Sequence, residues 1–183
     1  MKIYIFPNLN KKNCAEYTSV ACNVLNNCGA ELFIDEIYKE EFCKLEFLNF
    51  IKETTFISDC DVIVVIGGDG TILKCAKFAA THKKPILGIN CGRLGFMTSL
   101  EHNQIGLLEK LCKGEYTTSR RMMLSVSVEP KNSEHLKFTA LNDVVISKSD
   151  DCKIADFEVS KNGKTISSLR ADGVIFSTPT GAT

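Results

Sequence analysis

Apolar and polar residues alternate along the first 112 residues in blocks that predict strands and helices in turn. Residues 62–66 are all apolar and β-branched, as strands covered on both faces of a sheet tend to be. Residues 14–27 carry apolar side chains at helical spacing, and Gly29 predicts where that helix ends. Together these patterns predict strands at 2–6, 31–35, 61–66 and 85–89, and helices at 14–27, 40–51 and 71–81.

The order of these elements predicts an α/β fold, with a Rossmann-like N-terminal layer built on a parallel sheet. Right-handed crossovers place the loops that follow the strands along one edge, where ligands bind in such sheets. A short helix at 104–113 ends this layer. The later pattern predicts strands at 122–128, 136–147, 154–160 and 173–177, with Asn162-Gly163 as a hairpin turn.

Two domains follow from this change of pattern, an α/β domain at 1–112 and a β-rich domain at 113–183. Residues 178–183 form a turn where a further element should follow, and a β domain ending there would keep unpaired strand edges. We therefore expect the second domain to be truncated.

Composition and charge narrow the function classes. The chain has 22 Lys and Arg against 22 Asp and Glu, a balance that argues against a large nucleic-acid footprint. Its nine cysteines include no CxxC motif, so we expect free thiols in a reducing cytosol rather than a zinc or redox site. No apolar run approaches the roughly 20 residues of a membrane span. The three histidines have no nucleophile partner and form no HExxH motif. We expect a cytoplasmic protein that binds neither nucleic acid nor a membrane.

The sequence Gly67-Gly68-Asp69-Gly70-Thr71 follows the clearest strand and carries the main candidate chemistry. Its glycines let the main chain approach a ligand closely, and successive N–H groups before a helix can face phosphate oxygens. The loop lacks the Lys-Ser/Thr pair of a Walker A motif and the third glycine of a Rossmann fingerprint. The alternative is a tight strand-to-helix turn with Asp69 as the helix N-cap.

Three further segments add candidate ligand contacts. Residues 88–96 form a second glycine-rich loop that ends in Phe96, whose ring could pack on a nucleobase; alternatively Leu94 and Phe96 fill the core. Asn142-Asp143 offers groups for adenine or ribose edges, although such a pair is more often a turn. Arg170 could bind a pyrophosphate with both arms of its guanidinium, although alone it suits a solvated surface charge.

Taken in order, GGDGTIL, NCGRLGF, the Asn142-Asp143 pair and DGVIFSTPTG resemble the NAD kinase (ATP-NAD kinase) family along almost the whole chain. The resemblance implies a C-terminal β-sandwich, so that the fold is a Rossmann-like parallel layer followed by the beginning of a β-sandwich. It also implies transfer of the ATP γ-phosphate to the adenosine 2′-hydroxyl of NAD, with Mg²⁺ or a similar ion. The implied partners are NAD and ATP, and the implied assembly is a homo-oligomer whose sites borrow residues from a neighbour.

The resemblance also implies roles for individual residues, carried over by motif position. Asp69 matches the proton acceptor, although it could instead hold the metal ion, and no other metal ligand is implied. The implied substrate contacts are Gly68, Asp69, Gly70, Lys74, Phe96, Asn142, Asp143, Lys153, Arg170, Asp172, Thr180 and Thr183.

The motifs depart from the family pattern in two places. Asn142-Asp143 replaces the usual Asn-Glu, and TGAT replaces TGST with the following Ala-Tyr missing. Two other functions stay open at this point. A lipid kinase of the diacylglycerol or sphingosine type shares the GGDGT loop, and a fragment could bind NAD without catalysis.

Overall fold

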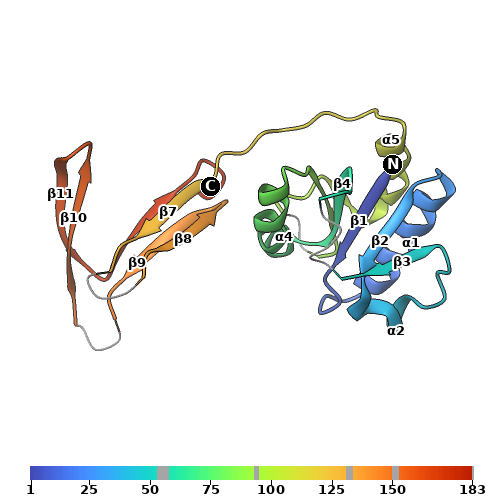
Figure 1. Ribbon diagram of the computed structural model, residues 1–183, viewed down its shortest axis with the longest axis horizontal. Helices are drawn as coiled ribbons and strands as arrows, with labels where there is room; N and C mark the ends of the chain where they lie inside the picture. Colours follow the sequence, from blue (N-terminus) through green and yellow to red (C-terminus); the bar gives the residue numbers. More distant parts are fainter. Residues whose placement is uncertain (53–57, 93–94, 131–133, 150–152, 183) are drawn as a thin grey trace. The chain divides into compact units, whose positions relative to one another are not determined.

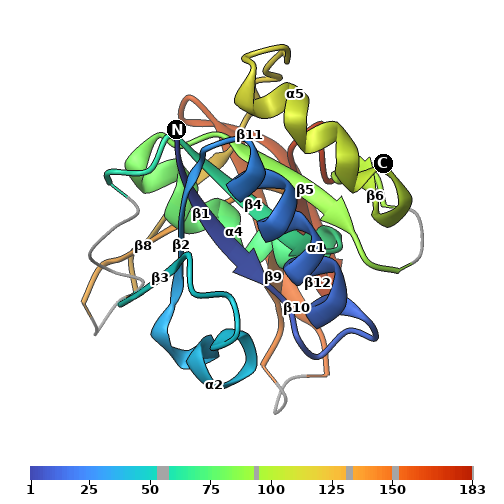
Figure 2. The same ribbon diagram turned by 90° about the vertical axis from the view of Figure 1, so that its right-hand side faces the viewer.

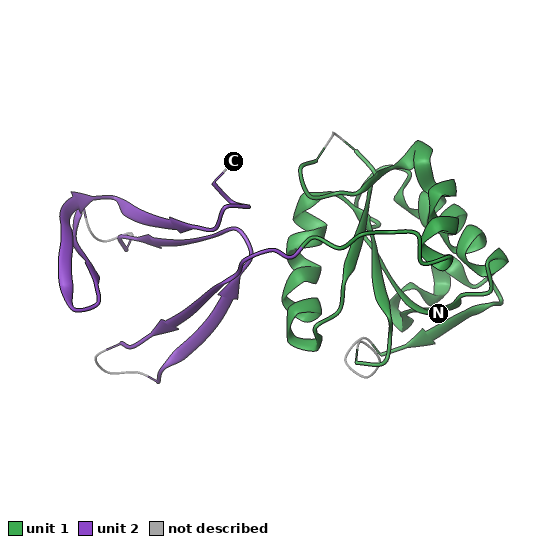
Figure 3. Ribbon diagram, turned by 90° about the horizontal axis from the view of Figure 1, so that it is seen from above, with its two compact units in different colours: residues 1–119 green, residues 120–183 purple. Residues whose placement is uncertain are grey.

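The computed structural model (Figure 1) describes residues 1–183 except 53–57, 93–94, 131–133, 150–152 and 183. The chain divides into two compact units, unit 1 at Met1–Ser119 and unit 2 at Arg120–Thr183 (Figure 3). The last helix of unit 1, α5, spans Leu108–Cys112, whereas the unit itself ends at Ser119.

Unit 1 is built on a parallel sheet of six strands in the order β3-β2-β1-β4-β5-β6. This is the strand order of the doubly wound Rossmann fold. The strands span Lys2–Pro7 (β1), Glu31–Asp35 (β2), Leu48–Ile51 (β3), Val62–Gly67 (β4), Ile86–Asn90 (β5) and Leu100–Glu101 (β6). The predicted parallel α/β layer is therefore confirmed.

Helices cover both faces of this sheet (Figures 1 and 2). Helix α1 (Cys14–Asn27) and the segment of η2 (His102–Leu107) and α5 pack on one face, against Ile3, Ile5 and Ile66. Helix α4 (Asp69–His82) packs on the other face, against Tyr4 and Ile63. Successive side chains of one strand thus pack into the apolar clusters on opposite faces of the sheet, because side chains alternate between the two faces along a strand.

The predicted helix at 40–51 is wrong. The chain forms only η1 (Glu36–Tyr38) and α2 (Lys39–Phe42) before it returns as strand β3. Leu48 pairs with Leu32 of β2 and is buried there. Pairing with the edge of the sheet satisfies the backbone hydrogen bonds of residues 48–51. The apolar spacing of this segment fits a helix equally well, and this tertiary pairing decides in favour of a strand.

Unit 2 consists of antiparallel strand pairs. Their strands are β7 (Leu124–Val128) with β8 (Leu136–Ala140), β9 (Asp143–Ser147) with β12 (Gly173–Ser177), and β10 (Ala155–Lys161) with β11 (Lys164–Ala171). The predicted β-rich region is confirmed, but the run at 136–147 is two strands, because Leu141 and Asn142 leave the ladder. The hairpin turn is confirmed: Asn162 and Gly163 have φ values of 53° and 74°, as a type I′ turn requires.

The two units differ in how many of their apolar side chains are buried. Every buried apolar side chain among the described residues belongs to unit 1. Unit 2 instead exposes large apolar side chains from all of its strand pairs, namely Leu136, Phe138, Val145, Ile146, Ile166, Leu169, Ile175 and Phe176. Unit 1 therefore has the apolar core that stabilises a domain, whereas the strand pairs of unit 2 leave apolar faces uncovered. In neither unit does a described helix combine the length and apolar character that a membrane crossing demands.

The central strand supports a direct test of this core. Ile63 is fully buried between β1 and β5, whereas Ile37 of η1 is 72% exposed. Ile63→Ala should lower the free energy of unfolding by about 2–5 kcal/mol because it removes buried methyl groups and leaves a cavity. Ile37→Ala is the matched control and should change it by less than about 0.5 kcal/mol. Urea unfolding followed by circular dichroism measures both, and equal effects would contradict this packing.

Candidate functional site

The candidate site of unit 1 lies at the carboxyl edge of β1 and β4. These neighbouring strands pair along their length, and their connections leave on opposite faces, through α1 after β1 and α4 after β4. Such a switch point opens a crevice at the carboxyl ends of the strands, where open α/β sheets bind their ligands. The residues after the two strands, from Asn8 and from Gly68, therefore line the candidate site.

The first glycine loop is tied firmly to the end of β1. Asn8 donates its backbone N–H to the Ile66 carbonyl (2.9 Å) and its side-chain amide to Thr71 Oγ1 (3.0 Å). The same hydroxyl accepts the Gly68 N–H at 3.4 Å, and the Thr71 N–H donates to the Gly68 carbonyl at 2.8 Å. Asn8 and the buried Thr71 thus hold the main chain of the loop in place.

Asp69 is the first residue of α4, and its carboxylate reaches the second glycine loop. Oδ2 accepts the Phe96 N–H at 2.8 Å and Oδ1 accepts the Met97 N–H at 3.1 Å. Gly68, rather than Asp69, is the N-cap residue of the helix, so the alternative in which Asp69 caps α4 is wrong. We call this pair of hydrogen bonds the Asp69 clamp.

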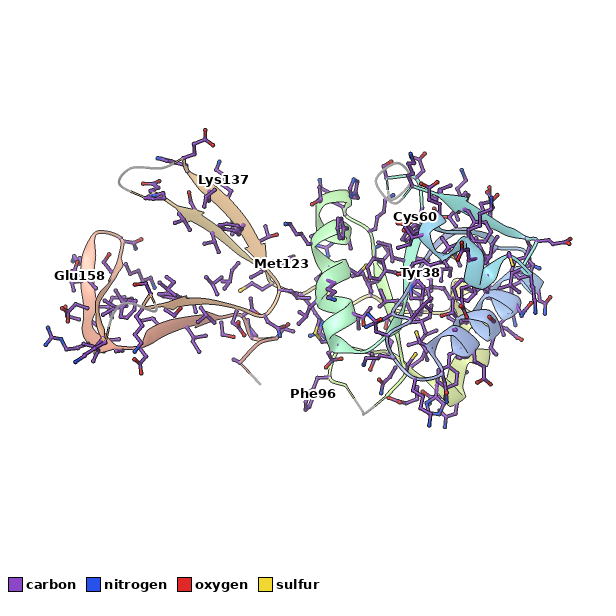
Figure 4. All side chains as sticks on the ribbon, turned by 90° about the horizontal axis from the view of Figure 1, so that it is seen from below. Tyr38, Cys60, Phe96, Met123, Lys137 and Glu158 are labelled. Carbon is purple, nitrogen blue, oxygen red and sulfur yellow. The ribbon has the colours of Figure 1, made fainter. Side chains whose placement is uncertain are left out.

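Gly95 makes the Asp69 clamp possible. A Cβ at position 95 would overlap the Asp69 carboxylate, so only glycine lets the two groups approach. The adjacent Phe96 is held by its backbone while its ring projects from the loop (Figure 4), 85% exposed. The alternative that Phe96 fills the core is therefore wrong, and Leu94 lies outside the described residues. A fixed, exposed aromatic ring suits stacking on a ligand.

The second loop has its own internal support. Asn90, fully buried at the end of β5, accepts the Gly92 N–H at 3.1 Å and donates to the Glu101 carboxylate at 3.0 Å. Sequence reasoning missed Asn8 and Asn90 as supports of the site. Asn8 and Asn90 could have been predicted as supports, because each is a polar residue at the carboxyl end of a predicted parallel strand.

Lys11 is a third residue that sequence reasoning missed. Its ammonium lies against the Gly68 main chain, close enough that a Cβ on Gly68 would overlap Nζ. By contrast, the structure places Lys74 away from both glycine loops. Lys74 lines a separate cavity of about 360 Å³ whose other walls are Tyr4, Phe6, Asp35, Ile37, Tyr38 and Phe78.

Two thiols lie beneath this edge. Cys14 donates to the Ile66 carbonyl at 3.3 Å, and the Cys91 N–H donates to the Gly67 carbonyl at 2.7 Å. A hydrogen bond from the Cys91 thiol lowers the pKa of Cys14 to about 7 despite its burial, and it raises the pKa of Cys91. Elsewhere burial alone raises the pKa of Cys22 to about 12, which agrees with a small buried apolar role.

In unit 2 the structure brings one predicted group together at one end of the β9–β12 pair. The Asn142 carbonyl accepts the Thr178 N–H at 2.7 Å, and Asp143 pairs with Ser177. Thr178 is buried and donates its hydroxyl to the Leu141 carbonyl at 2.6 Å. The loop that follows includes Thr180, whose N–H donates to Thr178 Oγ1 at 3.2 Å.

One atom of this group has an unmet hydrogen-bonding capacity. Asn142 Oδ1 is buried and has no hydrogen-bond partner among the described residues. Buried acceptors are nearly always paired in native proteins, so this oxygen suits a donor supplied by a ligand. Thr183, the last predicted contact, lies outside the described residues.

A second predicted group lies at the other end of the same strand pair. Asp172 precedes β12 and forms an ion pair with Lys148 at 2.8 Å, and Lys148 also donates to the Lys153 carbonyl at 2.9 Å. Asn142 and Asp172 flank these strands at opposite ends, so about six residues of extended chain, roughly 20 Å, separate them. The structure therefore does not unite Lys153 and Asp172 with Asn142.

Arg170 uses both arms of its guanidinium within unit 2. It donates to Asp156 at 2.8 and 3.1 Å across the β10–β11 hairpin. These hydrogen bonds lower the pKa of Asp156 and raise that of Arg170. A phosphate that approached the Nε and Nη2 edge of Arg170 would therefore compete with this carboxylate.

No three His, Cys, Asp or Glu side chains gather as a metal site anywhere in the described ranges. What unit 1 offers is a glycine loop, an ammonium and one carboxylate at the switch point of a doubly wound sheet. These features define the class of nucleotide-binding α/β proteins that hold phosphates with main-chain amides.

Comparison with known proteins places the chain within this class. The ATP-NAD kinase N-terminal domain model matches residues 3–116, and the ATP-NAD kinase C-terminal domain model matches residues 141–183. The chain therefore belongs to the ATP-NAD kinase family.

Curated relatives support the same assignment. An NAD kinase of Thermoanaerobacter sp. (strain X514) is 37% identical over 183 residues, which are 100% of this chain and 64% of the relative. An NAD kinase of Geotalea daltonii is 43% identical over 133 residues, 72% of this chain and 47% of the relative. The chain thus spans less than two thirds of the length of these relatives.

A solved structure confirms the fold. The crystal structure of yeast NADH kinase complexed with NADH matches with a TM-score of 0.90 at 21% sequence identity. The match covers 100% of this chain and 59% of the yeast chain.

Gly95 provides a test of the Asp69 clamp. Gly95→Ala should lower the free energy of unfolding of unit 1 by about 1–3 kcal/mol, because the new Cβ forces the carboxylate off its two amide donors. Gly92→Ala is the matched control in the same loop, since its Cβ would stand 3.7 Å from Lys11 Nζ, an ordinary contact. Thermal unfolding measures both variants, and the clamp is absent if the two are equally stable.

Proposed function

We propose that the protein is an NAD kinase, which transfers the γ-phosphate of ATP to the 2′-hydroxyl of the adenosine moiety of NAD and yields NADP. Family membership supports the reaction class. The observation that carries the proposal is the arrangement of Asp69: a carboxylate fixed between two glycine loops at the ligand-binding edge of the sheet.

Asp69 is the proposed proton acceptor for the 2′-hydroxyl. Each of its oxygens accepts one backbone N–H and keeps further lone-pair capacity for a hydroxyl. The clamp fixes the direction of the carboxylate before substrate arrives, which is the positioning that general base catalysis needs. Since phosphoryl transfer depends mostly on positioning and charge stabilisation, the base does not have to be strong.

The glycine loop is the proposed phosphate-binding element. Gly68 is buried with an extended main chain, and Gly70 has no heavy atom within 4 Å of the place a Cβ would occupy. The dipole of the 14-residue helix α4 favours negative charge at this N-terminus.

The donor set also fits Mg²⁺ bound together with ATP. Mg²⁺ commonly takes one or two carboxylates and completes its shell with phosphate oxygens and water, so a three-ligand protein site is not required. Asp69 is the one carboxylate of the glycine loop, and holding the ion is the alternative to its role as proton acceptor. The chemistry that Mg²⁺ supplies when bound is neutralisation of the phosphate charge.

The adenosine of NAD is the proposed ligand of Asn142 and Asp143, supported by the unpaired buried Asn142 Oδ1. Phe96 is the proposed stacking surface for a base, and Thr180 and Thr183 are further proposed contacts. Lys74, Lys153, Arg170 and Asp172 remain proposed substrate contacts, although the first lines a separate cavity and the others lie far along the strands from Asn142.

We also propose a homo-oligomeric, cytoplasmic enzyme. The uncovered apolar side chains of unit 2 support association with another protein surface. The eight described cysteines are all free thiols, which suits a reducing compartment.

The direct test is formation of NADP from NAD and ATP by the complete protein that contains this chain. Asp69→Asn should lower kcat by about 10²- to 10⁴-fold, the usual contribution of a general base. Gly95→Ala distinguishes the role of the Asp69 carboxylate as a base from its role in holding the loop, because this variant disturbs the clamp but keeps the carboxylate. A larger loss for Asp69→Asn than for Gly95→Ala supports the base role. Phosphorylation of diacylglycerol or sphingosine with no NADP formed would overturn the proposal.

Gly70 offers a test in which stability and activity move in opposite directions. Gly70→Ala places alanine in the first turn of α4 and should raise the free energy of unfolding by about 0.5–1 kcal/mol. If substrate approaches this glycine, the same methyl group should lower NADP formation by about 10²-fold. Gly106→Ala is the control, since it also meets no heavy atom and lies away from the glycine loops in η2. Unchanged activity in Gly70→Ala would remove Gly70 from the site.

A further inference from the structure

Lys11 stands in the short connection between β1 and α1, and two turns fix its backbone. Its N–H donates to the Asn8 carbonyl at 3.0 Å, and its carbonyl accepts the Cys14 N–H at 3.2 Å. The residue therefore belongs to the same carboxyl edge of the sheet as the first glycine loop, at the switch point between β1 and β4.

The ammonium of Lys11 lies against Gly68 of the first glycine loop and near Gly92 of the second. A Cβ on the buried Gly68 would overlap Lys11 Nζ, and a Cβ on Gly92 would stand 3.7 Å from the same atom. Gly68 has a φ of −158°, an extended conformation open to any residue. Glycine therefore fits position 68 because the Lys11 ammonium occupies the space where a side chain of residue 68 would begin. Backbone strain plays no part.

No ion pair among the described residues neutralises the charge of this ammonium. Lys11 is half-buried, and no carboxylate in the described part of the chain forms an ion pair with it. Its charge acts on the thiols of Cys14 and Cys91. A partly desolvated ammonium without an anionic partner costs free energy, and an anion bound beside it removes that cost.

We propose that Lys11 binds the polyphosphate of the ATP donor above the Gly68 main chain, and that it acts on the donor and not on NAD. This inference rests on the proposed kinase function. A lysine contributes a point charge with three donors, which suits phosphate oxygens, and the nearby N-terminus of α4 also favours negative charge. Lys11 and the glycine loop thus form the two sides of one phosphate site.

The kinetic test compares Lys11→Ala with a matched neighbour. Lys11→Ala should raise the KM for ATP by about 10- to 100-fold, the loss of one charge-assisted contact, with the KM for NAD within about twofold of wild type. Lys12→Ala removes the same charge from the exposed adjacent residue and should change neither constant. Lys11→Arg keeps the charge and should restore most of the ATP affinity.

Gly68→Ala is a second, independent variant. Its methyl group would displace a flexible ammonium rather than backbone, so thermal unfolding should show a folded protein while the KM for ATP rises as in Lys11→Ala. A raised KM for NAD alone, or unchanged constants in Lys11→Ala, would overturn the proposal.

Calorimetry with ATP and no NAD separates this inference from the proposed function. If the wild-type protein makes no NADP but binds ATP in a Lys11-dependent manner, the phosphate site stands and the kinase assignment fails. If the wild-type protein makes NADP and the Lys11→Ala variant binds ATP as tightly as wild type, the kinase assignment stands and the proposed role of Lys11 fails. If it neither makes NADP nor binds ATP, both fail.

Discussion

The carboxylate of Asp69 accepts the Phe96 and Met97 amides at 2.8 and 3.1 Å, and the candidate site of unit 1 depends on this contact. It joins the loop after β4 to the loop after β5, two segments that no strand pairing holds together at that point. It also explains why Gly95 has no side chain and why the Phe96 ring stays exposed while its backbone is fixed. One side chain thus fixes both the direction of its own carboxylate and the position of the neighbouring loop.

The clamp can act in this way because the fold beneath it is rigid. Strand β4 is buried along its whole length, and α4 packs on it directly after the glycine loop. The order of the strands brings the end of β1 to the same edge, so Asn8 and Lys11 meet residues about 60 positions away in sequence. Unit 2 is different, since its candidate residues stand on strand pairs that bury no apolar side chain.

The sequence predicted most of unit 1 because buried parallel strands and amphipathic helices have distinct apolar periods. The helices at Cys14–Asn27 and Asp69–His82 and the strands β1, β2, β4 and β5 follow such patterns or turn signals closely, whereas β3 was predicted as a helix and the two-residue β6 was too short to predict. The glycines before a predicted helix and the adjacent Asp69 predicted the candidate site, although the same pattern also fits a tight strand-to-helix turn. The partner of Asp69 was not predictable, since backbone amides carry no residue signature. The pairing of Arg170 with Asp156 depends on which residues of the β10–β11 hairpin lie opposite each other. This register was not predictable from the turn at Asn162 alone, because it shifts between Val159 and Ser160.

We propose that the phosphate donor binds at the carboxyl edge of β1 and β4, beside Lys11 and the Gly68 main chain. Titration of ¹⁵N-labelled protein with ATP, followed by amide chemical shifts, tests this claim most directly. The account predicts that the largest shifts fall on Lys11, Gly68 and Gly70, and that Phe96 and Met97 follow through the clamp. Largest shifts around Asp35 and Phe78, in the separate cavity that contains Lys74, with unchanged glycine-loop amides, would contradict it.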